Sequence, residues 1–430
     1  MPMYPSRSIA FPHSLQRASS LRRVFSEVRT VPGIVLVVLV TTLYAGFGGP
    51  GLGGFAGSGF AWIVPLAVAL FCFLWPRPAV AAPLLIWLPW LAVVLGHGGA
   101  AHERYEIQRT TMFICPMIVG LAVSMCRAGP RQLRAFLMLC KFAAVFLWLT
   151  ILFRSHLVFG SAPLGWGASG AGLVMTTTLL AVLFAVEGAM NRTKSFLWWL
   201  AMAAIPSLLV ARTGIVVSIV VLPFTAAPLR WLWRLGLLCC GGGLMLAVFM
   251  LPGVQQKMFY SGEGELADLT WDNPGLRTNA RNAIWEAMLP DIAKRPWFGH
   301  GPGAAFEGLK MSGWAVDHPH NDWLRLLYNY GIIGCAAFLI CAGIQMYHLL
   351  RIAGSAVSVE VRILAYTGVS SFVALFLFMI TDNIINYPNF FGNLQFTIIG
   401  LVYAASGMGR IGAGSLPMHP FASRPVTMLA

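Results

Sequence analysis

Charged residues are scarce in this sequence, and acidic residues are the scarcest. Only 10% of the 430 residues are Asp, Glu, Lys or Arg, whereas a water-soluble protein carries about 25%. Hydrophobic residues make up 58% of the chain, and apolar runs long enough to cross a bilayer recur along its whole length. A water-soluble protein is therefore excluded, and the predicted fold class is an all-α polytopic membrane protein.

Cysteine clusters and acidic loops are also missing. All eight cysteines fall in apolar runs, so we expect neither a disulfide framework nor a Cys-x-x-Cys metal site. The first outer loop, residues 48–57, has no acidic residue, which favours metal-independent chemistry. The net charge of +14 would suit a nucleic-acid partner, but Lys and Arg also collect on the cytoplasmic loops of membrane proteins. We expect no nucleic acid.

Apolar periodicity predicts about twelve transmembrane helices. They cover residues 31–48, 58–75, 79–96, 110–126, 133–153, 168–190, 195–211, 212–228, 232–251, 322–349, 362–381 and 389–408. Most basic residues of the short loops lie on one side of the membrane if the N-terminus is cytoplasmic. We therefore predict that both termini are cytoplasmic and that the long loop between spans nine and ten is outside.

This topology divides the chain into five parts. They are a basic cytoplasmic tail (1–30), spans one to nine (31–251), the outer loop (252–321), spans ten to twelve (322–408) and a cytoplasmic tail (409–430). The loop and its exit hold nine of the fifteen acidic residues, so it is the part most like folded aqueous protein. In Thr278–Ile292, Ile284 and Met288 have helical spacing, which predicts an amphipathic helix that Pro290 kinks or shortens.

His320 is the first candidate for chemistry. It lies in His318-Pro319-His320-Asn321-Asp322, just before a predicted span that Asn321 or Asp322 can cap. A helix N-terminus disfavours imidazolium, so a histidine there stays neutral and can accept a proton. A loop hydrogen bond at the interface is the equal alternative. A zinc site with His318 and Asp317 is the weaker one, because no second ligand cluster accompanies it.

Two arginines are candidates for binding an anion. Arg281 begins the amphipathic loop helix one turn before Trp285, and Arg212 lies between two apolar runs. A guanidinium binds phosphate oxygens through two parallel hydrogen bonds. Alternatively, Arg281 is a loop residue whose charge faces water, and Arg212 lies at a helix end and extends its side chain to the membrane surface. Asp382 ends the eleventh span on the same face, where it could orient the histidine, pair with an arginine or cap a helix.

Other ionisable residues have simpler interpretations. Arg325 lies three residues after Asp322, which predicts a local ion pair. Lys141 and Glu187 lie toward the cytoplasmic ends of their spans and can reach the membrane surface. Ionisable residues are few near the middle of the membrane, where proton-coupled transporters carry them.

These motifs resemble those of the O-antigen ligase/polymerase superfamily. His320-Asn321-x-x-Leu324 followed by Gly331-x-x-Gly334 is similar to its signature. The upstream Arg281-x-x-x-Trp285 and Pro296-Trp297-Phe298-Gly299-x-Gly301 are similar to its loop pattern, and Arg212-Thr213 resembles the arginine of its preceding helical hairpin. The resemblance is strongest over residues 205–405. His318 and Pro319 stand outside the pattern.

The resemblance implies a GT-C-like enzyme that transfers a glycan from undecaprenyl diphosphate to a hydroxyl at the periplasmic face of the bacterial inner membrane. It implies an inverting, metal-independent reaction without cofactors. We predict an O-antigen ligase of lipopolysaccharide biosynthesis, with lipid A–core as acceptor, in contact with membrane lipids. A repeat-unit polymerase is the alternative, and a twelve-span transporter or lipid flippase is the alternative of another class.

The predicted roles follow the same resemblance. His320 takes the proton of the acceptor hydroxyl, and Arg281 and Arg212 hold the diphosphate. The residues expected to contribute to substrate binding are Arg281, Arg212, Asn321, His318, Asp382 and Trp285.

Overall fold

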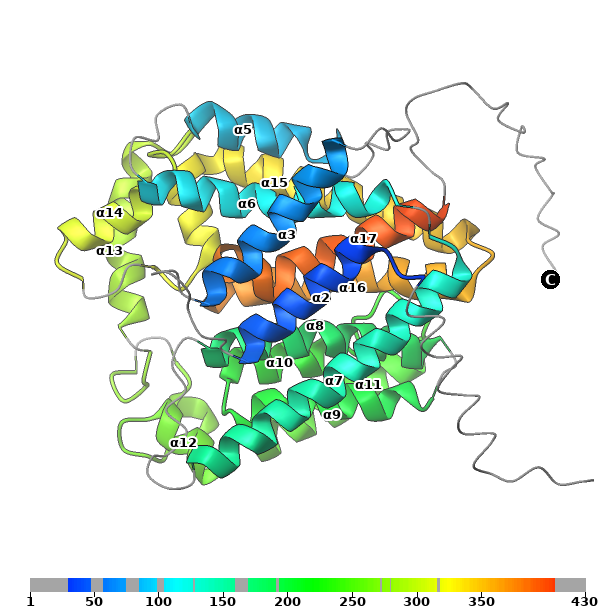
Figure 1. The fold of residues 1–430 in the computed structure, drawn as a ribbon. Coiled ribbons are helices and arrows are strands. Elements are labelled where there is room, and N and C mark those ends of the chain that lie inside the picture. The colour runs from blue at the N-terminus through cyan, green and yellow to red at the C-terminus, as the bar shows by residue number, and fades with distance from the viewer. Residues whose placement is uncertain are drawn as a thin grey trace, which may run out of the picture.

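The computed structural model describes residues 30–47, 57–74, 85–98, 104–126, 128–158, 169–190, 193–270, 273–278, 280–314 and 318–406. Within these ranges the protein is helical and contains no strand. Most helices run side by side along one direction, and α12, α13 and α14 lie at one end of the bundle (Figure 1). The predicted cytoplasmic tails fall almost entirely outside the described residues, so the orientation in the membrane stays a prediction.

A helix occupies each of the twelve predicted segments. These helices are α2 (Gly33–Phe47), α3 (Gly57–Leu74), α5 (Leu88–Gly98), α6 (Arg104–Ser124), α7 (Pro130–Val158), α8 (Ser169–Ala189), α9 (Ser195–Leu208), α10 (Arg212–Val220), α11 (Trp231–Phe249), α15 (Asp322–Ser355), α16 (Val359–Thr381) and α17 (Asn393–Ser406). Six of them, α6, α7, α8, α11, α15 and α16, are long and apolar enough to span a membrane. The all-helical membrane fold is therefore confirmed, and twelve crossings remain a prediction.

The eighth predicted span is shorter than its apolar run. Helix α10 has 9 residues, which at about 1.5 Å per residue covers less than half of a bilayer core. The rest of the run, from Val221 to Pro228, forms turns whose apolar side chains Val221, Leu222 and Ala227 are buried. Burial against the bundle explains the hydrophobicity that predicted a full span here. Helix α9 packs on α10, and Arg212 begins α10 just after the turn of this hairpin.

Small residues bring the central helices together. An ideal Cβ atom on Gly400 of α17 would lie 2.5 Å from the carbonyl oxygen of Gly120 in α6, so only glycine permits this approach. Helix α8 is almost completely buried among its neighbours. Close contact of this kind drives helix association in lipid, where apolar side chains gain nothing by leaving water.

The long loop folds into three helices, α12 (Pro252–Met258), α13 (Arg281–Lys294) and α14 (Ala304–Met311). Ile284 and Met288 of α13 are buried in a small core with Leu309 and Tyr328, which confirms the predicted amphipathic helix. Pro290 does not shorten α13, because the helix continues to Lys294. Pro290 lacks the N–H that would donate to the carbonyl of Glu286, four residues earlier, and this exposed side of the helix tolerates the loss.

Helix α15 is interrupted where the Gly-x-x-Gly motif begins. Gly331 has φ +65° and ψ −168°, a conformation open only to glycine. The freed backbone bonds to the Pro-Trp-Phe-Gly segment: the N–H of Ile332 donates to the Pro296 carbonyl at 2.8 Å, and the N–H of Gly301 donates to the Asn329 carbonyl at 2.8 Å. Backbone hydrogen bonds between the two sequence motifs thus hold the loop against α15, the helix that begins beside His320.

Candidate active site

The turn that follows α16 joins the predicted site residues. The Arg281 guanidinium donates to the carbonyl oxygen of Thr381 at 2.8 Å. The hydroxyl of Thr381 lies 2.6 Å from that of Thr213, which follows Arg212. Asn383 lies two residues after Thr381, and its side-chain amide nitrogen is 3.4 Å from Nδ1 of His320. Residues 381–383 therefore contact segments that lie 63 to 168 residues away in the sequence.

His320 is held by contacts on both sides along the chain. Its φ is +50°, a left-handed conformation that histidine adopts more readily than most residues. On one side, the indole N–H of Trp285 donates to the Pro319 carbonyl at 2.6 Å. On the other, the side chain of Asn321 caps α15 by accepting from the Leu324 N–H at 3.0 Å. The cap confirms that the helix begins at Asp322, and the half-buried imidazole stands at its mouth.

The Asp322–Arg325 ion pair lies in the first turn of α15, next to His320. Its N–O distance is 2.7 Å, and both side chains are buried. The other carboxylate oxygen of Asp322 accepts the backbone N–H of Ile385 at 2.8 Å. Ile385 belongs to the 3₁₀ turn η2 (Ile384–Asn386), which directly follows Asn383. The predicted local pair is confirmed, and it also ties α15 to the turn that contacts His320.

Asp382 interacts electrostatically with both His320 and Arg281. Burial raises the pKa of its carboxyl group, while the N–H of Asn383, the charge of His320 and the charge of Arg281 oppose that rise. The Asn383 N–H donates to Asp382 at 2.8 Å. Asp382 is thus close enough to interact electrostatically with both the candidate base and a candidate anion-binding residue.

Four cations gather where α10, α12 and α13 meet. They are Arg212, Lys257, Arg277 and Arg281. Arg212 donates to the Arg277 carbonyl at 3.3 Å and 3.4 Å, and Lys257 donates to the Val210 carbonyl at 2.7 Å. Among the described residues, no carboxylate lies within ion-pair distance of any of the four. Lys257 and Arg277 were not among the predicted site residues, because the contacts between their segments and Arg212 form only in the tertiary structure.

Burial makes these charges costly. It lowers the pKa of the Arg281 guanidinium, with Asp382 acting in the opposite direction. Burial, followed by the charge of Arg212, lowers the pKa of Lys257. Arginine stays protonated nevertheless, and the buried Nε of Arg281 has no hydrogen-bond partner in the described part of the chain. Partly buried arginines that have no carboxylate within ion-pair distance in the described ranges are expensive, so the cluster, with the more exposed Lys257 beside it, fits an anionic ligand.

An apolar groove extends from this cluster. It has a volume of about 460 Å³ and lies between α10, α11 and α12, and Arg212 is the one charged residue among the described residues that line it. Its other walls include Ile215, Met245, Phe249 and Leu269. The groove can hold a long hydrocarbon chain with its anionic end at Arg212.

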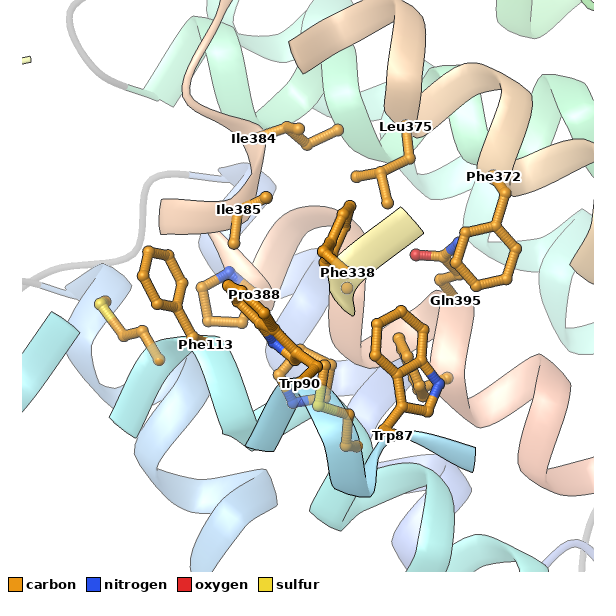
Figure 2. A pocket seen from close by; sticks show the side chains of 15 residues that line it. Trp87, Trp90, Phe113, Phe338, Phe372, Leu375, Ile384, Ile385, Pro388 and Gln395 are labelled. Atoms are coloured by element: carbon orange, nitrogen blue, oxygen red, sulfur yellow. The ribbon is translucent and has the colours of Figure 1, made fainter. Parts of the chain in front are cut away.

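Two further pockets lie near the turn. A small polar pocket is lined by Arg109, Phe113, Gly303, Ala305, Phe306, His318, Pro319, Arg325, Asn329 and Asn386. An apolar cavity of about 40 Å³ is lined by Ile384 and Ile385 and by Trp90, Phe113 and Phe338, among others (Figure 2). Aromatic side chains line much of this cavity, which is too small for a substrate.

His318 lies on the polar-pocket side of His320. The two imidazole centroids are 6.2 Å apart. No group of three His, Cys, Asp or Glu among the described residues could hold a metal ion, and Asp317, the third member of the weighed zinc site, lies outside them. Asn383 contacts His320 but was not among the predicted site residues. Its position directly after Asp382 was the only feature of the sequence that could have indicated it.

Residues 196–339 match the family model described as O-antigen ligase. The matched segment begins in α9, ends within α15 and contains Arg212, Arg281 and His320. No curated protein matches the chain. The match covers the loop, the Gly331 interruption and the capped histidine, so residues 196–339 are similar to an O-antigen ligase domain, which supports the O-antigen ligase/polymerase superfamily.

Proposed function

We propose that this protein is an O-antigen ligase. It transfers a polysaccharide from undecaprenyl diphosphate to a sugar hydroxyl of lipid A–core, at the periplasmic face of the bacterial inner membrane. The observation that carries the proposal is the convergence on Thr381–Asn383 of a histidine and of arginines that have no carboxylate within ion-pair distance among the described residues.

The donor occupies the cation cluster and the apolar groove. Its isoprenoid chain lies between α10 and α11, and its diphosphate binds Arg212 and Arg281. Lys257 and Arg277 add positive charge beside them. The positive groups stabilise the negative charge that grows on the diphosphate as it leaves, as preorganised donors do in other transfer reactions. We expect them to serve without a divalent metal ion.

His320 is the general base. The amide nitrogen of Asn383 lies 3.4 Å from Nδ1 of His320, and the amide oxygen has no hydrogen-bond partner among the described residues. Turning the side-chain amide by 180° exchanges two atoms of nearly equal size and places the oxygen at Nδ1. Nδ1–H then donates to Asn383, and Nε2 carries the lone pair. Nε2 takes the proton of the acceptor hydroxyl while the hydroxyl oxygen attacks the anomeric carbon. The bond from that carbon to the phosphate oxygen breaks with inversion, and Asp382 stabilises the imidazolium that forms.

Identification of the product tests this function. Purified protein in nanodiscs is given a defined lipid-linked glycan together with lipid A–core. We expect the glycan on the core. Lengthened lipid-linked glycan instead would show a repeat-unit polymerase, and movement of unmodified donor across a vesicle membrane without any new glycosidic bond would show a flippase.

A further inference from the structure

Trp297 and Phe298 are two neighbouring aromatic residues of the long loop whose side chains face outward. They are 61% and 62% exposed, although they lie in none of the predicted membrane spans. Single exposed apolar side chains are ordinary, whereas contiguous exposed apolar surface marks a site of interaction. The surroundings of this pair therefore decide what covers it.

The segment that carries the pair is attached to two helices of the bundle. The N–H of Ile333 in α15 donates to the carbonyl oxygen of Trp297 at 3.1 Å. Near the end of α5, Nε2 of His97 lies 2.8 Å from the carbonyl oxygen of Phe298. The exposed apolar side chains beside these two contacts are Leu95, Ile332 and Ile333. The aromatic pair thus belongs to a larger apolar surface that the loop shares with α5 and α15.

The exposed face of α15 begins where the loop segment contacts the helix. No residue in the described stretch 321–331 is exposed, and this part of the chain packs against α13, α14 and α16. After Gly331 one face of α15 is exposed. Its large apolar residues are Ile332, Ile333, Leu339, Ile340, Ile344, Tyr347 and Leu350.

The length of this exposed face matches the hydrocarbon layer of a bilayer. From Ile332 to Leu350 the helix rises about 27 Å, and the hydrocarbon core of a membrane is about 30 Å thick. The next residue, Arg351, is exposed, and arginines near helix ends extend their charge to the membrane surface. Ile332 therefore marks the opposite boundary of the hydrocarbon. Trp297 and Phe298 lie at this boundary, and His320 lies on its water side.

We propose that Trp297 and Phe298 insert into the bilayer leaflet on the loop side and anchor the long loop to phospholipid. The occupant is lipid because the apolar surface of the pair continues into the lipid-facing side of α15. Aromatic side chains are favoured at the membrane–water interface for the same physical reason, since their rings are apolar and their position borders the headgroups. The inference goes beyond the proposed function and holds whichever reaction the site catalyses.

The anchor also supports the candidate active site through α13. This helix lies at one end of the bundle (Figure 1) and ends three residues before Trp297. Its first residue, Arg281, donates to the Thr381 carbonyl at 2.8 Å. α13 is thus held at one end by the turn after α16 and at the other by the anchored segment. Lipid contact at Trp297 and Phe298 sets the height of α13 above the membrane.

Photolabelling of the wild-type protein by lipid tests the anchor. The protein is reconstituted in phosphatidylcholine vesicles that contain a phosphatidylcholine with a diazirine near the top of one acyl chain, and adducts are located by mass spectrometry. Met311 is the matched comparison: it is 87% exposed and belongs to α14 of the same loop, which contacts α15 at Tyr328 and Asn329, before the exposed face begins. We expect Trp297 and Phe298 to carry more adducts than Met311 by about tenfold, the preference that burial of one large apolar side chain supplies.

A second probe, with the diazirine at the end of the acyl chain, measures depth. It should label Leu339 and Ile340 in the middle of the exposed face and give few adducts on the aromatic pair. Few adducts on Trp297 and Phe298 with both probes would show that water or a second copy of the chain covers them, and the proposal would be overturned. Equal labelling of Met311 would overturn it too, because a loop immersed as a whole has no specific anchor.

Substitution by a charged residue gives an independent measurement. A carboxylate on a surface that faces water changes stability little, whereas a carboxylate that replaces a lipid contact is costly. We expect Phe298→Glu to lower the thermal midpoint of the protein in nanodiscs and Met311→Glu to leave it unchanged. Equal midpoints for the two variants would contradict lipid contact at Phe298.

Discussion

Gly331→Ala should break the contact that holds the long loop, residues 252–321, against α15. Alanine at the φ and ψ of Gly331 costs about 1–3 kcal/mol from backbone strain alone. Its Cβ would also lie 2.4 Å from the carbonyl group of Trp297, so the Pro-Trp-Phe-Gly segment must move. That segment shares four backbone hydrogen bonds with α15, donated by His300, Gly301, Ile332 and Ile333. At about 0.5–1.5 kcal/mol each, their loss brings the total to roughly 3–9 kcal/mol.

Thermal unfolding in detergent, followed by tryptophan fluorescence, measures this effect. Gly343→Ala is the matched control, because Gly343 lies in the same helix and nothing lies within 4 Å of an ideal Cβ there. We expect Gly331→Ala to lower the apparent midpoint clearly and to abolish transfer, because the loop also carries Trp285 and Arg281. The control should be neutral or slightly stabilising. A Gly331→Ala protein that unfolds with the wild type and remains active would refute this account of the motif.

Three further predictions concern the donor side. Arg281→Ala should lower kcat/KM by about 10²–10³-fold and weaken binding of undecaprenyl diphosphate. Arg295 is an exposed residue at the end of the same helix, and Arg295→Ala should have neither effect. Equal effects of the two substitutions would exclude a specific contact between Arg281 and the diphosphate. Burial lowers the pKa of Lys257, so its charge is lost at a lower pH than that of an ordinary lysine. Donor affinity should therefore fall as pH rises through that lowered pKa, and Lys257→Arg should keep its affinity over the same range; identical pH profiles would rule Lys257 out. Dialysis against EDTA should leave transfer unchanged, and a strict requirement for a divalent cation would contradict the role given to the arginines.

The sequence was a good guide to where helices form. Apolar runs located all twelve helices, because apolar length and periodicity determine which segments leave water. The failure at residues 212–228 has the same cause. A buried turn and a membrane span are equally hydrophobic, so composition could not show that α10 ends at Val220.

Pairings between distant segments were beyond the sequence. His320, Arg281, Arg212 and Asp382 were placed on one face by topology, but nothing indicated that the turn after α16 would connect them. Lys141 and Glu187 show the same limit. Each was expected to reach the membrane surface, and instead they form an ion pair of 3.0 Å in which Glu187 is fully buried. A residue's partner depends on packing between helices, which one-dimensional periodicity does not contain.

The most direct test of the central claim is transfer by His320→Ala, with donor binding measured on the same preparation. His348→Ala is the control, an exposed histidine at the other end of α15. General-base assistance is worth about 10²–10⁴-fold. We therefore predict that His320→Ala binds undecaprenyl diphosphate-linked glycan as tightly as the wild type and transfers it at least a hundred times more slowly. Near-normal transfer by this variant would contradict the assignment of His320 as the base.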